Sequence, residues 1–411
     1  SLFYLLGTAL LYSQHGTLDI VLLSQRADCE PASLLAVALM TTGLLAKTAL
    51  VPLHFWLPPA HAGAPSSASA LLSALVVKGS FFIIVRLWFN AMPSLPGFTA
   101  TQLLAVLGGV AIVFGSVLAL CQQRLKLLIA YSTLAQIGYL FLMFPLAFSV
   151  SGKLDSGIAL AGGLLQAVSH AMAKAAMFMV CGSIYTTLGH DCLSELGGVW
   201  RRLPISVLAF ALSGLALMGL PPGGAYVAKE LLIQAAVEQS QWWWIVVLQA
   251  GGIFTGAYVF LVLIKIIATK TKPLHSYDAT PRVCEVAALA LALCSLFLGL
   301  LPWDVYLPIP PGVLWNKLDL GAFSKAFILL TCSAIIASLL SRGAVPVEHL
   351  SRRKLFERWV DSLRYATLRS STLIERGNNM LRQWPTACIF LLLLTLLFMV
   401  AMLAKNSFLH R

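Results

Sequence analysis

The chain has 411 residues, of which 59% are hydrophobic and only 11% are charged. Water-soluble domains carry about 25% charged residues, so this composition excludes a soluble globular protein and indicates an integral membrane protein. The formal net charge is +12, and no long polar segment marks a second globular domain. We therefore expect an all-α fold, a polytopic bundle of transmembrane helices.

The first two elements are a partial span and a broken span. The apolar stretch 1–12 is shorter than the about 20 residues that cross a bilayer, and it lacks the basic region and cleavage pattern of a signal peptide. We interpret it as the second part of a membrane helix and expect the natural protein to be longer at this end. The segment 33–57 can span, and it contains Lys47 near its centre followed by Pro52, which predicts a discontinuous helix.

Uninterrupted apolar segments that are long enough to span lie at 66–92, 101–120, 125–147 and 156–188. Lys78 lies near the middle of the first of them. The last contains His170 and Lys174, which are four residues apart and therefore share one face of a helix. A lysine at the centre of a bilayer costs on the order of 2.5–3.5 kcal/mol on insertion scales, so these lysines need a functional or structural explanation.

The segment 204–238 is longer than one span requires and is interrupted by Pro221 and Pro222, with Lys229 and Glu230 following. In the first broken segment the lysine comes before the proline, and here it comes after. Opposite order is typical of two copies in opposite membrane orientation. The remaining expected spans lie at 242–268, 283–302, 324–341 and 386–405.

Between the last two spans, the segment 342–385 is charged and amphipathic. Phe356, Trp359 and Leu363 recur at helical spacing with arginines between them, which predicts a helix lying at the cytoplasmic interface. Such a helix could brace neighbouring subunits or serve only as a linker lying on the membrane, and the sequence leaves both interpretations open.

The positive charge is explained by topology. Alternating the spans divides the loops into two sets, and one set carries most of the basic residues outside the spans, beginning with Arg124, Lys126, Arg201 and Arg202. The positive-inside rule assigns that set to the cytoplasm. The net charge therefore gives no indication of a nucleic-acid partner.

The ionisable residues within or beside the spans form a series that suits proton relay: Lys47, Lys78, His170, Lys174, Lys229 and Glu230. Burial favours a neutral lysine, a nearby carboxylate favours a charged one, and histidine titrates near neutrality with little tuning. The alternative is that these lysines pair with isolated carboxylates or extend to the membrane surface. Several central lysines cannot all reach the surface, which favours the relay.

Neither metal nor redox chemistry is indicated. The eight cysteines form no CxxC pair and the eight histidines show no HExxH spacing. The sequence also has no dinucleotide-binding motif. We therefore expect no cofactor and no catalytic centre in this chain.

Several sequence segments together resemble a known family. They are 46-AKTALVPLHFWLPPAHAGAP, 68-ASALLSALVVK, 125-LKLLIAYSTLAQIGYL, 169-SHAMAKAAMF, 196-LGGVWRRLP and 219-GLPPGGAYVAKELL. The sequence is similar to the antiporter-like subunits shared by respiratory complex I, Mrp-type cation/proton antiporters and energy-converting hydrogenases.

The resemblance implies two inverted repeats, with Lys47 and Lys229 on the broken helices, Lys78 bridging, and His170 and Lys174 connecting. The family's glutamate partner of Lys47 belongs to an upstream helix with no counterpart here. The implied divisions are the remainder of a first repeat at 1–147, a second repeat at 148–302, an additional span at 303–341, a lateral-type helix at 342–385 and a final span at 386–411.

The resulting functional hypothesis is a proton-translocating subunit, with or without Na⁺ exchange, in a bacterial inner membrane. Its partners would be other membrane subunits and, in some complexes, a peripheral redox module. The host could be a complex I-like or hydrogenase-like assembly or a multisubunit antiporter. Alternatives are a membrane partner of a zinc protein in inorganic-carbon uptake and a non-conducting structural subunit.

Overall fold

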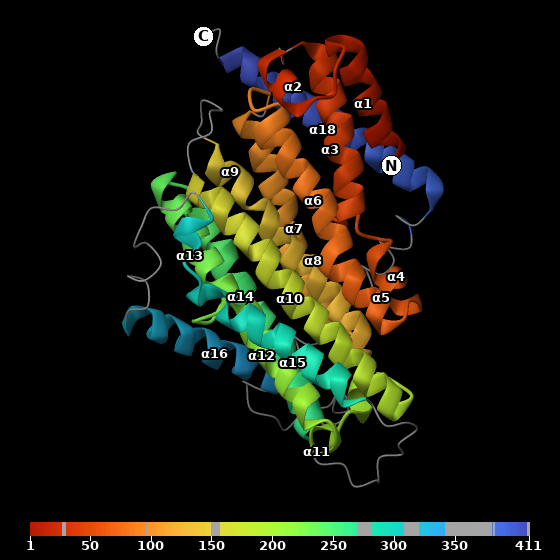
Figure 1. The fold of residues 1–411 in the computed structure, drawn as a ribbon, viewed down its shortest axis with the longest axis vertical. Coiled ribbons are helices and arrows are strands. Elements are labelled where there is room, and N and C mark those ends of the chain that lie inside the picture. The colour runs from red at the N-terminus through yellow and green to blue at the C-terminus, as the bar shows by residue number, and fades with distance from the viewer. Residues whose placement is uncertain are drawn as a thin grey trace, which may run out of the picture.

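The computed structural model describes residues 1–26, 30–95, 97–148, 157–268, 281–307, 320–341, 380 and 383–408. Within these ranges the chain is helical and forms no strand, apart from one isolated bridge between Arg124 and Cys192. The helices form an elongated bundle with α1 (Leu2–His15) and α18 (Trp384–Phe408) at one end and α16 (Leu320–Ser341) at the other (Figure 1).

Nine helices of the described ranges are long and apolar enough to cross a membrane: Pro31–Thr48, Ser66–Ala91, Phe98–Cys121, Leu125–Ala147, Gly157–Leu188, Trp242–Ile267, Arg282–Leu300, Phe323–Ser341 and Thr386–Ala404. They agree with the spans predicted from the sequence. The expected all-α fold is confirmed, and the chain is an integral, multi-pass membrane protein.

The first predicted helix break is present. Helix α3 (Pro31–Thr48) ends one residue after Lys47, and Ala49 adopts a left-handed conformation with φ 62°. The chain passes through Pro52, which follows a cis peptide bond, before α4 (Leu57–Gly63) begins. Pro52 therefore lies within the interruption, as expected from its lack of a backbone donor.

The second predicted break separates α12 (Pro204–Met218) from α13 (Gly224–Glu238). Gly219 terminates α12 with φ 78°, and the Pro221–Pro222 peptide bond is cis. Lys47 thus precedes its break and Lys229 follows its own. The second halves, α4 and α13, lie at opposite sides of the bundle in Figure 1.

One helix is less regular than expected. The span from Ser66 to Ala91 consists of α5 (Ser66–Leu71), a π-helical turn at Leu72–Val76, α6 (Val77–Arg86) and a second π-helical turn at Leu87–Ala91. π-helical turns often occur at functional sites because they free backbone groups from the regular ladder. The first of these turns immediately precedes Lys78.

The core of the bundle is formed by α8 (Leu125–Phe141) and α10 (Gly157–Leu188), beside α7 (Phe98–Cys121), α9 (Met143–Ala147), α14 (Trp242–Ile267) and α15 (Arg282–Phe297). Helix α8 is buried along nearly its whole length. Helix α10 runs obliquely through the bundle and packs against α5, α8, α12, α13 and α15 (Figure 1). These two helices therefore connect the parts of the chain that carry the two breaks.

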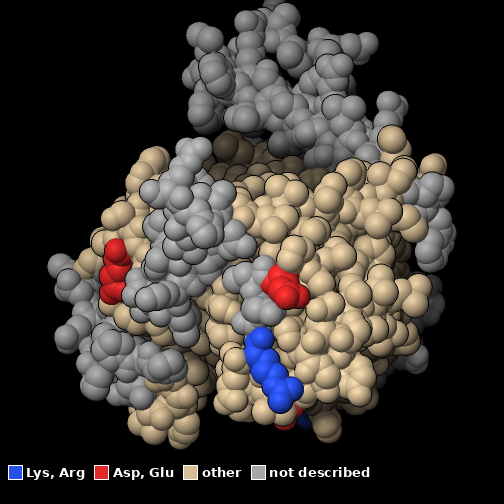
Figure 2. Space-filling view, turned by 90° about the horizontal axis from the view of Figure 1, so that it is seen from above, with Lys and Arg blue, Asp and Glu red and all other residues tan. Residues whose placement is uncertain are grey.

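The outer surface is apolar, as a lipid-facing surface requires. Large hydrophobic side chains such as Leu75, Val106, Val246 and Leu393 are exposed. Figure 2, which views the α1 and α18 end, shows few acidic or basic side chains among the described residues. Exposed apolar surface of this extent is expected for a protein in contact with lipid or neighbouring membrane subunits.

The last predicted span is present as α18, whereas the lateral-type helix predicted at 342–385 lies almost entirely outside the described residues. The division of the chain into two repeats stays a prediction.

Candidate functional site

Lys47 differs from the other predicted relay residues because its side chain is exposed within the described part of the chain. It lines a hollow of about 510 Å³ between α1, α3 and α6, together with Gly43, Leu75, Gly79 and Ser80. The residue after it, Thr48, donates a hydrogen bond to the Ser80 hydroxyl at 3.0 Å. The Lys47 side chain is therefore open to this hollow, and its assignment to the relay stays a prediction.

Lys78 is half-buried, and its side chain contacts the π-helical turn that precedes it in the chain. Its ammonium group donates a hydrogen bond to the Ser73 carbonyl. The Ser73 hydroxyl in turn shares a hydrogen bond of 3.0 Å with the Thr133 hydroxyl of α8. Lys78 is thereby linked to α8, the most buried helix of the bundle.

His170 and Lys174 are both fully buried on α10. The Lys174 ammonium donates to the Ser132 hydroxyl at 2.5 Å and to the Ile129 carbonyl at 3.4 Å. Neither ring nitrogen of His170 has a hydrogen-bond partner, and Lys78 and Lys174 are the charged groups that act on the ring. His170 lies one helical turn from Lys174 on the same face of α10, and its assignment as a connecting residue stays a prediction.

A second histidine of this region was not among the residues predicted from the sequence. His61 on α4 is fully buried, stacks on Phe178 at a centroid distance of 4.6 Å, and has no hydrogen-bond partner at either ring nitrogen. Lys78, Lys126 and Lys174 are the charged groups that act on it. We refer to Lys78, His61, His170 and Lys174 as the lysine–histidine cluster.

A row of polar side chains on α8 leads away from this cluster. Ser132, Gln136 and Tyr139 recur at helical spacing and are all buried. The Gln136 amide donates to the Thr255 hydroxyl of α14 at 3.1 Å. The Gln136 amide also donates to the Tyr258 hydroxyl of α14 at 3.5 Å, and Ser132 and Thr255 are further polar neighbours of that hydroxyl. We call these five residues the α8 polar row.

The far end of the row meets Lys229, which is buried with a 7% exposed fraction. Its ammonium group donates to the Met218 carbonyl at 2.7 Å and lies 5.0 Å from the centre of the Tyr139 ring. Met218 is the last residue of α12, so the helix break supplies the carbonyl that binds the lysine. The aromatic face attracts the same charge.

Glu230, the residue after Lys229, belongs to a small hollow next to that lysine. The two residues line one hollow of about 30 Å³ with Gln249 of α14 and Lys325 of α16, and Pro221 lies at its edge. A volume of this size holds about one water molecule. The hollow therefore brings the side chains of Glu230, Gln249 and Lys325 to the neighbourhood of Lys229.

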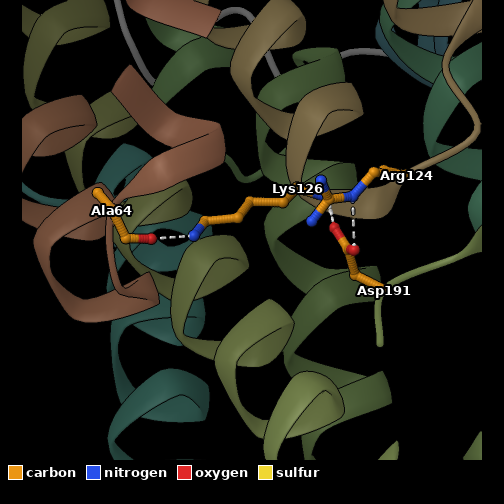
Figure 3. A network of polar contacts seen from close by, with 4 residues as sticks. All are labelled: Ala64, Arg124, Lys126 and Asp191. Atoms are coloured by element: carbon orange, nitrogen blue, oxygen red, sulfur yellow. Dashed lines mark hydrogen bonds and ion pairs between the residues drawn. The ribbon is translucent and has the colours of Figure 1, made fainter. Parts of the chain in front are cut away.

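A polar network ties the end of α4 to the start of α8 (Figure 3). Asp191 accepts hydrogen bonds from the Arg124 guanidinium at 2.9 Å and from the Lys126 backbone N–H at 3.1 Å. The Lys126 side chain reaches the other way and donates to the Ala64 carbonyl. The hydrogen bond with Asp191 raises the pKa of Arg124, so this arginine stays charged. The network holds His61 close to α8.

Within the described residues, no three His, Cys, Asp or Glu side chains gather closely enough to hold a metal ion.

Comparison with known proteins identifies the family. Residues 1–255 match the family described as NADH:quinone oxidoreductase/Mrp antiporter, TM. The chain belongs to this family.

Relatives of the NADH:quinone oxidoreductase/Mrp antiporter family occur in several kinds of complex. The chain is 32% identical over 266 residues to NADH-quinone oxidoreductase subunit N of Desulforudis audaxviator (strain MP104C), covering 64% of this chain and 51% of that protein. It is 29% identical over 334 residues to formate hydrogenlyase subunit 3 of Escherichia coli (strain K12), covering 74% and 53%. The chain thus spans about half the length of the curated relatives it matches.

Solved structures of this antiporter-like family share the fold. A chain of the membrane-bound sulfane sulfur reductase, an archaeal respiratory membrane complex, matches with a TM-score of 0.64 and 25% identity over 82% of this chain and 64% of that one. A chain of the Mrp complex from Dietzia sp. DQ12-45-1b matches with a TM-score of 0.64 and 23% identity over 83% and 65%. The suspected resemblance is therefore confirmed.

In this family member the structure brings most of the predicted site residues into one continuous region. Lys78, His170 and Lys174 gather in the cluster, and Lys229 and Glu230 lie beyond the α8 polar row. Lys47 stands apart in its own hollow. The α8 polar row itself was not predicted from the sequence.

Proposed function

We propose that this chain is a proton-translocating membrane subunit of a multisubunit complex, in which protons move laterally between Lys78 and Lys229. The main support is the series of buried polar groups between these lysines, which runs from the lysine–histidine cluster along the α8 polar row to the Tyr139 ring beside Lys229. A structural membrane subunit needs no such row, because each buried polar group must be satisfied at a cost that an apolar side chain avoids.

The chemistry of each position supports a role in the relay. His170 and Lys174 are both fully buried and share one face of α10, so a proton on one disfavours a proton on the other. Lys229 has a carbonyl and an aromatic face that favour its charged form. Glu230 and the adjoining hollow offer an exit from Lys229.

The proposal extends to the rest of the molecule. Lys47 and Lys229 would serve equivalent positions in two inverted repeats, because each lies beside a proline-containing helix break. The partners would be other membrane subunits, since relatives are named as subunits of NADH-quinone oxidoreductase and formate hydrogenlyase. A bacterial inner membrane and an exchange of Na⁺ for protons remain part of the hypothesis.

The test uses the full-length protein in its native complex. The complex would be purified in mild detergent, analysed by mass spectrometry, and reconstituted in liposomes with a pH-sensitive dye inside. A potassium diffusion potential then drives ions inward without any need to know the natural driving reaction. Sodium uptake measured in the same vesicles distinguishes proton transport from Na⁺/proton exchange.

We expect Lys229→Ala and Lys47→Ala to reduce proton uptake to the level of empty liposomes while the subunit composition stays unchanged. Lys265→Ala is the matched control, because Lys265 lies on the spanning helix α14 but donates to the Ser341 carbonyl, away from the relay. Normal proton uptake by both Lys229→Ala and Lys47→Ala would refute the proposed function.

A further inference from the structure

The α8 polar row contains a continuous set of hydroxyl groups that ends short of Lys229. Lys174 contacts Ser132 at 2.5 Å, and the Tyr258 hydroxyl lies within reach of both Ser132 and Thr255. Gln136 fixes the Thr255 hydroxyl through a hydrogen bond of 3.1 Å. These groups can pass a proton along α8 and α14 as far as Thr255.

Tyr139 is the side chain between Thr255 and Lys229. Its ring covers the Lys229 ammonium at 5.0 Å. Its hydroxyl oxygen would lie 2.1 Å from a Cβ atom at Gly251, the residue of α14 whose carbonyl accepts from Thr255. The side chain is fully buried, yet its hydroxyl has no hydrogen-bond partner in the structure. A buried hydroxyl without a partner is unusual and calls for an explanation.

The backbone around Tyr139 and Lys229 is shaped for these two side chains. A Cβ atom at Gly251 would overlap the Tyr139 hydroxyl, and one at Gly219 or Gly252 would lie 3.0 or 3.3 Å from the Lys229 nitrogen. Glycine at these positions therefore leaves room for the tyrosine hydroxyl and for the lysine head. The space that the Tyr139 hydroxyl occupies therefore depends on glycine at position 251.

We propose that Tyr139 is the gate of the relay: its ring holds charged Lys229, and its hydroxyl passes the proton that recharges the neutral lysine. This inference rests on the proposed function and adds the residue that controls the final transfer. In the described arrangement the gate is closed, because the Lys229 nitrogen is bound to the Met218 carbonyl and faces the ring.

The proton balance of the step is simple. A neutral Lys229 amine loses its attraction to the ring face and moves to the hydroxyl edge of Tyr139. The Tyr139 O–H bond breaks as its proton forms the third N–H bond of the Lys229 ammonium group. The tyrosine oxygen simultaneously receives the Thr255 hydroxyl proton, which is replaced through Tyr258 and Ser132. Overall, the Lys174 ammonium loses one proton, Lys229 gains it, and every hydroxyl group is restored.

Tyr139→Phe tests this inference, because it keeps the ring and removes only the hydroxyl. The variant would be measured in the reconstituted full complex with a potassium diffusion potential, beside Lys229→Ala in the same preparation. Tyr131→Phe is the control, since Tyr131 is a buried tyrosine on the same helix outside the row. Rates in H₂O and D₂O report whether a proton transfer within the protein limits transport.

We expect Tyr139→Phe to slow proton uptake about tenfold or more and to change the H₂O/D₂O rate ratio, with unchanged complex composition. Tyr131→Phe should transport like the unaltered protein. If Tyr139→Phe takes up protons at the normal rate while Lys229→Ala takes up none, the assignment of Tyr139 as the gate is refuted and the proposed function stands. If Tyr139→Leu is slow but Tyr139→Phe is normal, only the ring matters and the hydroxyl transfer is refuted. If Lys229→Ala is also normal, both proposals fail.

Discussion

The ammonium nitrogen of Lys174 lies 2.5 Å from the hydroxyl oxygen of Ser132, and both side chains are buried in the centre of the bundle. This contact joins α10 to α8 and connects the lysine–histidine cluster to the α8 polar row. The remaining acceptor of Lys174, the Ile129 carbonyl, lies at 3.4 Å. The charged form of Lys174 therefore depends strongly on one hydroxyl group.

Removal of that hydroxyl should impair transport. Ser132→Ala leaves a buried ammonium with a single distant acceptor, a loss of roughly 1–3 kcal/mol. We expect potential-driven proton uptake to fall about tenfold, in line with that energy, while the complex still assembles. Ser116→Ala is the control, because the buried Ser116 hydroxyl on α7 has no hydrogen-bond partner. Equal rates for the two variants would argue against the Lys174–Ser132 contact.

The amide of Gln136 should stabilise the fold as well as the row. It donates to Thr255 at 3.1 Å and accepts from Gln166 at 3.0 Å. Gln136→Leu removes the acceptor of the buried Gln166 amide and one of the partners of Thr255, whose hydroxyl still donates to the Gly251 carbonyl at 2.8 Å. We expect a loss of roughly 1–3 kcal/mol, measured as a lower midpoint of thermal unfolding. Gln234→Leu removes a hydrogen bond on the exposed face of α13 and should change stability by less than about 0.5 kcal/mol.

We expect substitution of Gly251, which lies beside the Tyr139 hydroxyl, to destabilise the protein. A Cβ at Gly251 would overlap the tyrosine hydroxyl, so Gly251→Ala must displace Tyr139 or the backbone of α14. Such overpacking costs about 1–3 kcal/mol, and we expect lower thermal stability together with slower transport. Gly109→Ala is the control, because a Cβ atom at Gly109 would lie 3.5 Å from its nearest neighbour, a ring carbon of Trp244, which is an ordinary contact distance. Normal stability of Gly251→Ala would show that this pocket is adaptable.

The carboxylate of Asp191 should stabilise the fold to the same extent across physiological pH. Because the pKa of Arg124 is raised in the folded protein, the stabilisation from its contact with Asp191 is fully present at any pH below the ordinary arginine pKa. This stabilisation is lost only as the pH rises through the raised pKa. We therefore expect Asp191→Asn to lower stability by roughly 1–3 kcal/mol, equally at pH 6 and pH 9. Glu195→Gln, which removes an exposed contact with His190, is the control. A loss confined to one end of this range would contradict the assignment.

The sequence was sufficient to predict the spans and both helix breaks, because apolar length and proline position act locally. Pro52 lies in the first interruption, after Lys47, and Pro221 lies in the second, before Lys229. These features depend on the chain's own backbone chemistry and do not require knowledge of neighbouring helices.

Other features required the tertiary structure. Ser132, Gln136 and Tyr139 follow a helical repeat that could have indicated a polar face, but their partners on α14 are more than a hundred residues away in sequence. The π-helical turn before Lys78 depends on packing and has no simple sequence signal. His61 lies among prolines and alanines, so its approach to three lysines was not apparent.

The length of α10 has a consequence for the surrounding lipid. This helix has 32 residues, about 48 Å at 1.5 Å per residue, whereas the hydrocarbon layer is about 30 Å thick. It must therefore lean strongly or protrude, and its angle will respond to bilayer thickness. Because α10 carries Lys174 and α8 carries Ser132, a change in angle alters the register of donor and acceptor. Acyl chain length should thus tune the rate of transport, making the membrane itself a regulator of this protein.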